Sequence, residues 1–225
     1  MISLSQYYEE NMYPLQNGVL RAVESCKTRF YLTGGTALSR AYYRHRYSDD
    51  LDFFVNNDPE YDEQTDIILE KLEEEGFFWD VSEDFFKAPG FRSIKVRWKK
   101  SDAVLKLDFV NDSTPHFGDF YSADFFNRID PIRNILSNKL GAIFRFAGKD
   151  VADIREIALH ETINWPEVIS EARQKDAGID LPYIGEILIT MSQAEFEVIH
   201  WINNPGWDVF KKDIENIVFD MLSAH

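Results

Sequence analysis

The sequence predicts an α+β protein whose first half mixes strands with helices and whose second half is entirely helical. Up to about residue 130, short runs rich in β-branched and aromatic residues alternate with segments of helical apolar spacing. Beyond residue 130 only the helical spacing continues, divided by breakers such as Gly148, Pro166 and Pro205. We therefore expect two domains, residues 1–129 and residues 130–225, packed together because no flexible linker separates them.

Each expected element follows from its own local pattern. Strands, the last two with strict apolar–polar alternation, are expected at residues 30–33, 51–55, 77–81, 92–99 and 103–110. Helices of the first half are expected at about residues 4–26, with a break near Pro14, and at residues 36–45 and 62–75. Helices of the second half are expected near residues 131–147, 151–161, 166–175, 192–203 and 207–223.

Composition limits the classes of protein and of metal site. With 225 residues, 44% of them apolar, the chain can bury a large core. No run reaches the ~18 apolar residues of a membrane span, and the amino terminus lacks a signal-peptide pattern, so we expect a cytoplasmic protein. Cys26 is the only cysteine, which excludes an intrachain disulfide and a thiolate zinc cluster. Any metal ion must therefore be held by oxygen or imidazole.

The charge balance argues against broad binding to a polyanion, because 39 acidic and 24 basic residues give a formal net charge of −15. A nucleic-acid partner would need a local basic patch. Two clusters are candidates, and the alternative for each is a solvated face with ordinary counter-charges. They are Arg40, Arg44, His45 and Arg46, and then Arg92, Lys95, Arg97, Lys99, Lys100 and Lys106.

Asp50 and Asp52 lie one residue apart within an apolar strand. Successive side chains of a strand point to opposite faces, so the two carboxylates share one face while Leu51 and Phe53 share the face that can be buried. Two like charges this close make physical sense mainly around a cation, unless one of them is protonated. The alternative is a strand end with two solvated aspartates.

A second strand carries one more carboxylate, Asp108. Leu105, Leu107 and Phe109 form one face of this strand, and Asp108 lies on the other face with Lys106 two residues away. If this strand neighbours the first, the three carboxylates would form a set of oxygen ligands suited to Mg²⁺. The alternative is a surface ion pair between Asp108 and Lys106.

Two glycines precede these strands in the segment LTGGTAL. Gly34 and Gly35 follow a strand, and Thr36 stands at the head of a helix, where free backbone N–H groups favour an anion such as a phosphate. Thr36 can also be a simple N-cap after a tight turn. A glycine turn, a short helix and then an Asp-x-Asp strand is a spacing that can hold a triphosphate beside its magnesium ion.

The segment GGTALSRAYYRHRYSDDLDFF closely resembles the first signature of the AbiEii/AbiGii nucleotidyltransferase toxins, a branch of the DNA polymerase β-like nucleotidyltransferase superfamily. KLDF at residues 106–109 resembles the strand of the third carboxylate, and NKLGAIFRFAGKDVADI resembles the helical Lys and Lys/Arg-Asp-x-x-Asp signatures. The matching positions of the first signature are Gly34, Gly35, Thr36, Ala37, Leu38, Tyr42 or Tyr43, His45, Arg46, Ser48, Asp50, Leu51, Asp52 and Phe53.

The resemblance implies a nucleotidyltransferase-like mixed sheet with flanking helices, and transfer of a nucleoside monophosphate from an NTP. Asp50, Asp52 and Asp108 would be catalytic and would bind Mg²⁺ or Mn²⁺, with Lys139 as a further catalytic residue. The nucleotide-binding residues would be Gly34, Gly35, Thr36, Arg46, Ser48 and Asp150. The resemblance also implies the toxin of a toxin–antitoxin or phage-defence system, with an antitoxin partner and the 3′ end of tRNA as acceptor. The basic strand residues 92–100 are the candidate docking face for that tRNA.

The helical signature can also be interpreted from its own pattern. In the helix expected at residues 131–147, Lys139 falls on the flank of the apolar stripe, so its side chain must reach past apolar neighbours to a charged group. The group is a nucleotide phosphate or a site carboxylate, unless Lys139 simply reaches solvent. Asp150 and Asp153 stand near the start of the next helix, where the alternative to a site role is an N-cap with an acidic first turn.

Two other functions remain open from the residues alone. The same chemistry can act on a protein or small-molecule hydroxyl, which the acidity of the chain favours slightly. A non-catalytic module that binds nucleotide or a partner is the other alternative. The histidines are scattered without a metal-ligand pair at helical spacing, and no motif surrounds a Ser or Cys nucleophile, which argues against a zinc hydrolase and an acyl-transfer enzyme.

Overall fold

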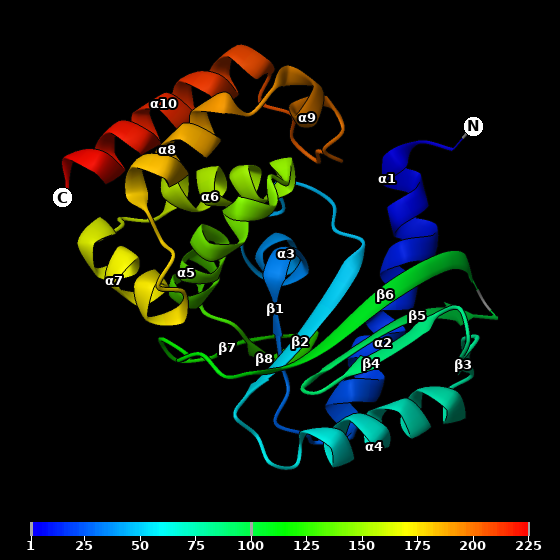
Figure 1. The fold of residues 1–225 in the computed structure, drawn as a ribbon. Helices are drawn as coiled ribbons and strands as arrows, with labels where there is room; N and C mark the ends of the chain where they lie inside the picture. Colours follow the sequence, from blue (N-terminus) through cyan, green and yellow to red (C-terminus); the bar gives the residue numbers. More distant parts are fainter. Residues whose placement is uncertain (1, 100, 225) are drawn as a thin grey trace. The chain divides into compact units, whose positions relative to one another are not determined.

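The computed structural model describes residues 2–99 and 101–224, and these form a mixed sheet with flanking helices, followed by a helical carboxy-terminal part (Figure 1). The predicted fold class is confirmed. The strands of the described residues are β1 Tyr31–Thr33, β2 Asp50–Asn56, β3 Phe77–Phe78, β4 Phe85–Ala88, β5 Phe91–Trp98, β6 Ser101–Asp112, β7 Tyr121–Ala123 and β8 Phe126–Ile129.

The sheet runs in the order β3-β5-β6-β2-β1-β8-β7, and β4 pairs with β5 beside this path. Two neighbouring pairs are parallel, β2 with β6 and β1 with β8, and the remaining pairs are antiparallel. The two long strands β2 and β6 therefore lie side by side and point the same way at the centre of the sheet.

The helices before the second half are α1 Leu4–Tyr7, α2 Tyr13–Ser25, α3 Gly34–Ala37 and α4 Tyr61–Glu74, with π-helical segments η1 Tyr8–Met12 and η2 Leu38–Tyr43. The later ones are α5 Ile132–Ala142, the 3₁₀ segment η3 Ile143–Arg145, α6 Gly148–His160, α7 Trp165–Lys175, α8 Leu181–Thr190, α9 Gln193–Glu197 and α10 Trp207–Ser223. Across residues 2–99 and 101–224, no helix is both long enough and apolar enough to cross a membrane.

The chain divides into two compact units. The first contains the sheet with α1, η1, α2, α3 and α4. The second contains the helices from Pro131 onward together with residues 38–46 and 115–119. Residues 38–46 join the helical unit through their backbone, because His45 O accepts hydrogen bonds from the N–H groups of Ile202 and Asn203. The prediction that the helical half packs against the sheet stays a prediction.

The two faces of the sheet differ in chemistry within the first unit. The core face carries buried side chains of β2 and β6 such as Leu51, Phe53, Leu107 and Phe109. α2 packs on β6, and α4 packs beside α2, so these two helices cover that face (Figure 1). The opposite face of the same two strands carries half-buried residues, among them the predicted carboxylates.

The predicted break near Pro14 is wrong. The backbone stays in the right-handed helical region through Tyr7, Met12 and Tyr13, and Pro14 lies in the first turn of α2, directly after η1. The helix instead changes its winding in the π-helical segment η1. An α-to-π change has no marked sequence signal, whereas a proline is easily interpreted as a stop.

Other differences have local causes. α8 has no counterpart among the predicted helices, because Pro182 and Gly185 resemble helix breakers. In the structure Pro182 lies in the first turn of α8, after the N-cap Asp180. Gly185 lets Val218 of α10 approach closely. The helix predicted at 192–203 ends at Glu197, since Trp201 turns back to pair with Arg46. The expected strand at 77–81 is only β3, and β4, β7 and β8 were not predicted, because strands this short show little alternation.

Candidate active site

The strand β2 presents Asp50 and Asp52 on the face opposite the core. Leu51, Phe53 and Val55 are buried, while Asp50 and Asp52 are half-buried, so the predicted alternation is confirmed. The apolar side chains fix the register of this strand, because a slip by one residue would bury both carboxylates and expose three large apolar groups. Burial of the core face thus holds the two carboxylates on one side of the sheet.

Asp108 lies directly beside Asp52. In the parallel pair β2 and β6, Asp52 is the register partner of Asp108 and Asp50 is the partner of Lys106. Neighbouring strands are about 4.8 Å apart, and register partners point to the same face. The three predicted carboxylates therefore come from two adjacent strands onto one face, in the arrangement expected from the sequence.

Two further side chains contact Asp108. Ser93 of β5 donates a hydrogen bond to Asp108 Oδ1 at 2.6 Å, and the ammonium of Lys106 lies 2.6 Å from Oδ2. Burial lowers the pKa of Lys106, but the hydrogen bond to Asp108 and the charges of Asp108, Asp50 and Asp52 outweigh it, so the pKa is raised. All three carboxylates thus act electrostatically on one cationic group at this place.

The same set suits a divalent cation by its chemistry. Within the described ranges, no three His, Cys, Asp or Glu side chains converge closely enough to bind a metal ion as they are placed. The three carboxylates suit a divalent cation by the type of their donor atoms, because Mg²⁺ prefers carboxylate oxygens as ligands. They also suit it by their charge, because all three already act on the ammonium of Lys106.

Gly34 completes this face from β1. β1 is antiparallel to β2, with Thr33 opposite Asp52, and Gly34 follows at the end of the strand with φ +71°. A Cβ atom at Gly34 would collide with Asp52 Oδ2 and would lie 3.1 Å from Asp52 Cγ. The glycine is required both by its left-handed backbone and by the carboxylate that lies against it.

Gly34→Ala should destabilise the protein by about 1–2 kcal/mol, the cost of a left-handed alanine, with a further cost from displacing Asp52. Gly141→Ala is the matched control, since Gly141 lies within helix α5 and an added Cβ would meet nothing within 4 Å. The free energy of unfolding in urea measures both variants. Equal stability of Gly34→Ala and the wild-type protein would contradict the close approach of Asp52.

The remaining predicted residues of the first unit have mixed surroundings. Gly35 is half-buried at the start of α3, and Ser48 is half-buried two residues before Asp50. Thr36 is fully buried, and its hydroxyl donates a hydrogen bond to the carbonyl oxygen of Asp50. The Thr36 side chain therefore ties α3 to β2, which leaves its backbone N–H as the group that an anion could use.

Lys139, Asp150 and Arg46 belong to a buried ion cluster of the second unit. Lys139 Nζ lies 2.6 Å from Asp150 Oδ1 and 2.6 Å from Asp153 Oδ2. Arg46 donates two hydrogen bonds of 2.7 Å to the two oxygens of Asp153, and His45 Nε2 lies 2.8 Å from Asp153 Oδ1. Asp153 is thus the acceptor shared by three basic side chains.

Burial and charge act in opposite directions on this cluster. Burial alone would raise the pKa of Asp153, but the charges of Arg46 and Lys139 outweigh it and hold that pKa well below its usual range. Burial lowers the pKa of Lys139, but Asp153 and Asp150 outweigh it, so that pKa is raised. Lys139 and Asp153 therefore stay charged near neutral pH. Neither aspartate caps the helix, because the N-cap of α6 is Ala147.

The predicted site residues thus fall into two sets. The first unit holds Gly34, Gly35, Thr36, Ser48, Asp50, Asp52 and Asp108, and the second holds Arg46, Lys139 and Asp150. Ser93 was not predicted, because its contact depends on the register of β5 on β6, which the sequence does not display. His45 is part of the resembling signature, but nothing in its neighbourhood points to Asp153, more than a hundred residues away.

The predicted basic strand cluster is not one basic face. Arg92 lies on the core side, only 2% exposed, and pairs with Asp62 and Asp66 of α4. Arg97 pairs with Asp84, and Lys106 pairs with Asp108. Lys100 lies outside the described residues. Strand periodicity separates Arg92 from Lys95 and Arg97. The charges of Arg92, Arg97 and Lys106 are neutralised locally by their ion pairs.

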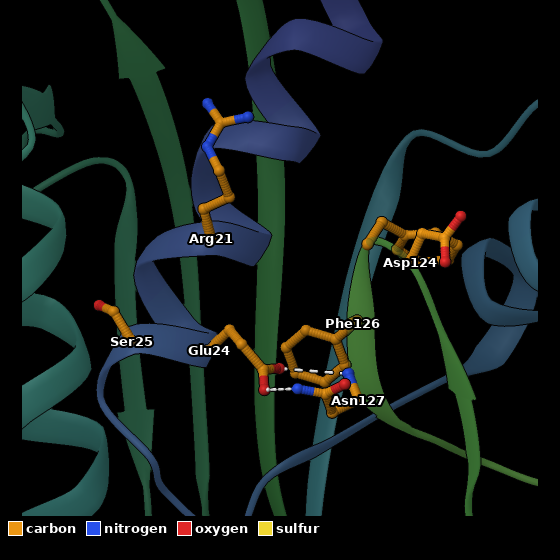
Figure 2. Close-up of a pocket in the computed structure, with 7 residues that line it drawn as sticks. Arg21, Glu24, Ser25, Asp124, Phe126 and Asn127 are labelled. Atoms are coloured by element: carbon orange, nitrogen blue, oxygen red, sulfur yellow. Dashed lines mark hydrogen bonds between the residues drawn. The ribbon is translucent and has the colours of Figure 1, made fainter.

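A separate hollow of about 300 Å³ lies between α2 and the β7–β8 hairpin. Figure 2 shows Arg21, Glu24 and Ser25 on α2, with Asp124, Phe126 and Asn127 opposite, and hydrogen bonds from Asn127 to Glu24. α2 covers the core face of the sheet, so this hollow is on the other side from the carboxylates. It is not part of the candidate active site.

The mixed sheet with its flanking helices is a nucleotidyltransferase-like fold. The structure is similar to JHP933 from Helicobacter pylori, with 18% identity, a TM-score of 0.65, and coverage of 94% of this chain and 90% of that chain. It is also similar to MenT4, a nucleotidyltransferase toxin from Mycobacterium tuberculosis H37Rv, with 15% identity, a TM-score of 0.57, and coverage of 94% and 82%. These likenesses establish the fold.

The chain belongs to the AbiEii nucleotidyl transferase toxin family of type IV toxin–antitoxin systems, whose model matches residues 19–220. The predicted family is confirmed. No curated protein matches this sequence. Membership makes the chain an enzyme that uses an NTP for nucleotidyl transfer, and a toxin that has an antitoxin partner.

Proposed function

We propose that the chain transfers a nucleoside monophosphate from an NTP to an acceptor hydroxyl at the face formed by Asp50, Asp52 and Asp108. The parallel register that sets Asp108 beside Asp52 carries this proposal. It places three carboxylates from two strands next to the Gly34 turn, where an NTP would bring both its phosphates and its metal ion.

Asp50, Asp52 and Asp108 would hold Mg²⁺ or Mn²⁺. When bound, such an ion neutralises the triphosphate and stabilises charge on the attacking and leaving oxygens. Asp108 would accept the proton of the acceptor hydroxyl. Its carboxylate, on β6, is held in place by the hydrogen bond from Ser93 of β5. Attack of that hydroxyl on the α-phosphorus forms the new P–O bond as the bond to pyrophosphate breaks.

The chain would orient the phosphates mainly with backbone groups. The N–H groups of Gly35 and Thr36 open helix α3, and Gly34, which has no side chain, lets the Asp52 carboxylate lie directly against that turn. Ser48 offers a hydroxyl two residues before Asp50. Lys106 would move from Asp108 toward the phosphates once the carboxylates bind a metal ion.

Arg46, Lys139 and Asp150 would act by position rather than by contact with the nucleotide. Each is already neutralised within the buried cluster of the second unit, and Asp153 holds Arg46 by a bidentate ion pair. Arg46 ends the segment of the second unit from which the chain continues to Ser48 and β2. The cluster would therefore fix the point from which the chain continues to Ser48 and β2.

The acceptor that we propose is the 3′ end of tRNA, in keeping with the family resemblance and with a toxin that acts in phage defence. The competing acceptor is a protein or small-molecule hydroxyl. The net charge of −15 and the local neutralisation of Arg92, Arg97 and Lys106 favour this alternative.

Each α-labelled NTP, incubated with the protein, Mg²⁺ and total cell RNA, distinguishes these acceptors. Label on RNA of tRNA size supports the proposal. Label on protein or on a small molecule supports the same chemistry with the other acceptor. No transfer from any NTP, with or without Mn²⁺, would contradict nucleotidyl transfer at this face. A parallel reaction with EDTA tests whether a divalent ion is required.

A further inference from the structure

The amino-terminal helical segment, η1 and α2, holds the three residues that directly precede β2, which are Tyr47, Ser48 and Asp49. Tyr8 of η1 is fully buried, and its hydroxyl donates a hydrogen bond to Asp49 Oδ1. The Tyr8 ring stacks on the ring of Tyr47, with centroids 4.0 Å apart and planes 15° from parallel. Gln16 of α2, also fully buried, donates from Nε2 to the carbonyl oxygen of Ser48 at 2.8 Å.

This helix thus contacts Tyr47 through its ring, Ser48 through its backbone carbonyl and Asp49 through its carboxylate. The next residue is Asp50, where β2 begins. Because the three contacts are of different kinds, they fix the path of the segment and also its rotation. The position of Ser48 and the entry of the chain into β2 are therefore set by residues far earlier in the sequence.

The winding of the helix matters for this contact. η1 is a π-helical turn inserted between α1 and α2, and such turns are rare and frequently lie at functional sites. A π turn takes an extra residue, so it changes which side chains before and after it share a face. Here Tyr8, at the start of η1, and Gln16, in α2 after it, both reach the segment Tyr47–Asp49.

Burial makes these contacts costly to lose. A buried hydroxyl or amide without a partner is destabilising, so Tyr8 and Gln16 hold their acceptors firmly. Burial and the hydrogen bond to Asp49 both raise the pKa of Tyr8, so its hydroxyl remains a donor at any physiological pH. The family match begins at residue 19, after both side chains, so membership of the family does not point to them.

We propose that Tyr8 and Gln16 are positioning residues that hold Tyr47–Asp49 and thereby aim Ser48, Asp50 and Asp52 at the nucleotide and its metal ion. This inference rests on the proposed function for its catalytic consequence. The anchoring itself can be measured without any reaction, because backbone amide exchange reports how firmly residues 47–52 are held.

Tyr8→Phe removes the hydroxyl and keeps the ring that stacks on Tyr47. Amide exchange of a peptide covering residues 47–52 should become about tenfold faster, the factor for one hydrogen bond to a charged group. The Mn²⁺ concentration for half-saturation, measured by paramagnetic resonance, should rise with it. Tyr183→Phe on α8 is the control, since Tyr183 is exposed and its hydroxyl makes no hydrogen bond with the other described residues.

Changes at Asp49 test whether Tyr8 acts through this carboxylate. Asp49 is exposed, so its replacement removes no packed side chain from the core. Asp49→Asn keeps an oxygen acceptor for Tyr8 and should retain near wild-type exchange, whereas Asp49→Ala should match Tyr8→Phe. The double variant Tyr8→Phe/Asp49→Ala should be no worse than either single one, because both changes remove the same bond.

Two results would overturn the inference: exchange of residues 47–52 in Tyr8→Phe and Asp49→Ala equal to wild type, or faster exchange with Mn²⁺ half-saturation unchanged. A wild-type protein that binds Mn²⁺ but transfers no nucleotide is a different outcome. It would refute the proposed function, while faster exchange and weaker Mn²⁺ binding in Tyr8→Phe would still support the positioning role.

Discussion

Asp52→Asn should lower the rate of nucleotidyl transfer by about 10²–10³-fold, the range for loss of one group that stabilises charge in a transition state. Asp52 is the central member of the three carboxylates, because its register partner is Asp108 and its own strand carries Asp50. Asparagine has nearly the same shape, so the contact with Gly34 remains while one negative charge is lost. The transfer of α-labelled NMP to total RNA measures the effect.

Asp102→Asn is the matched control for this change. Asp102 is an exposed carboxylate of the same sheet, near the start of β6 and six residues before Asp108. It should transfer at the wild-type rate, and both variants should unfold at the wild-type temperature. Retention of most of the activity by Asp52→Asn would show that the chemistry occurs elsewhere on the chain.

Asp153→Asn should destabilise the protein by about 3–5 kcal/mol at neutral pH, the cost of breaking a buried ion pair by removing one partner. Asp153 is fully buried and neutralises Arg46 and Lys139. Its removal would take from Arg46 and Lys139 the anion that they share, and Asp150, the other partner of Lys139, also pairs with Arg145. Urea unfolding measures the loss, and the exposed Asp220→Asn on α10 should change stability by less than about 0.5 kcal/mol.

The pH dependence of this loss has a defined sign. The pKa of Asp153 is depressed in the folded protein, so its contribution to stability is complete above the ordinary carboxyl pKa of about 3.9. As the pH falls below that value, the unfolded chain takes up a proton that the folded protein refuses, and the contribution decreases. The wild-type protein and Asp153→Asn should therefore become more similar in stability below pH of about 4. A constant difference down to acid pH would contradict the ionised state of Asp153.

The faces of the central strands could be predicted from the sequence because a period of two leaves one assignment that buries Leu51, Phe53, Leu107 and Phe109. The spacing from Gly34 to Asp52 likewise indicated a phosphate turn beside a carboxylate strand. Both signals are local, and each depends only on residues within one or two elements. The family signature lies in this same stretch.

The order of the strands could not be predicted in this way. β6 lies parallel beside β2, and the chain reaches it through α4 and an antiparallel hairpin, a path set by packing rather than by any residue pattern. The contact of Ser93 with Asp108 follows from that order. The sequence therefore indicated the three carboxylates but not the hydroxyl that holds one of them.

The ion cluster shows a similar limit. The position of Lys139 on the flank of an apolar stripe predicted a charged partner, and two were found, Asp150 and Asp153. Arg46 and His45 enter the same cluster from a segment that the sequence groups with the sheet, because only the pairing of residues 45–46 with residues 201–203 brings it to the helical unit. Arg46 is buried against Asp153, and its predicted role at the nucleotide stays a prediction.

The claim on which this account depends is that Asp50, Asp52 and Asp108 form one cation site. Paramagnetic resonance of Mn²⁺, titrated in the presence of a non-hydrolysable NTP analogue, tests it most directly. Asp108→Asn should weaken Mn²⁺ binding as strongly as Asp52→Asn, although the two residues are on different strands, and Asp102→Asn should bind as the wild-type protein does. Wild-type Mn²⁺ affinity in both Asp52→Asn and Asp108→Asn would contradict the site.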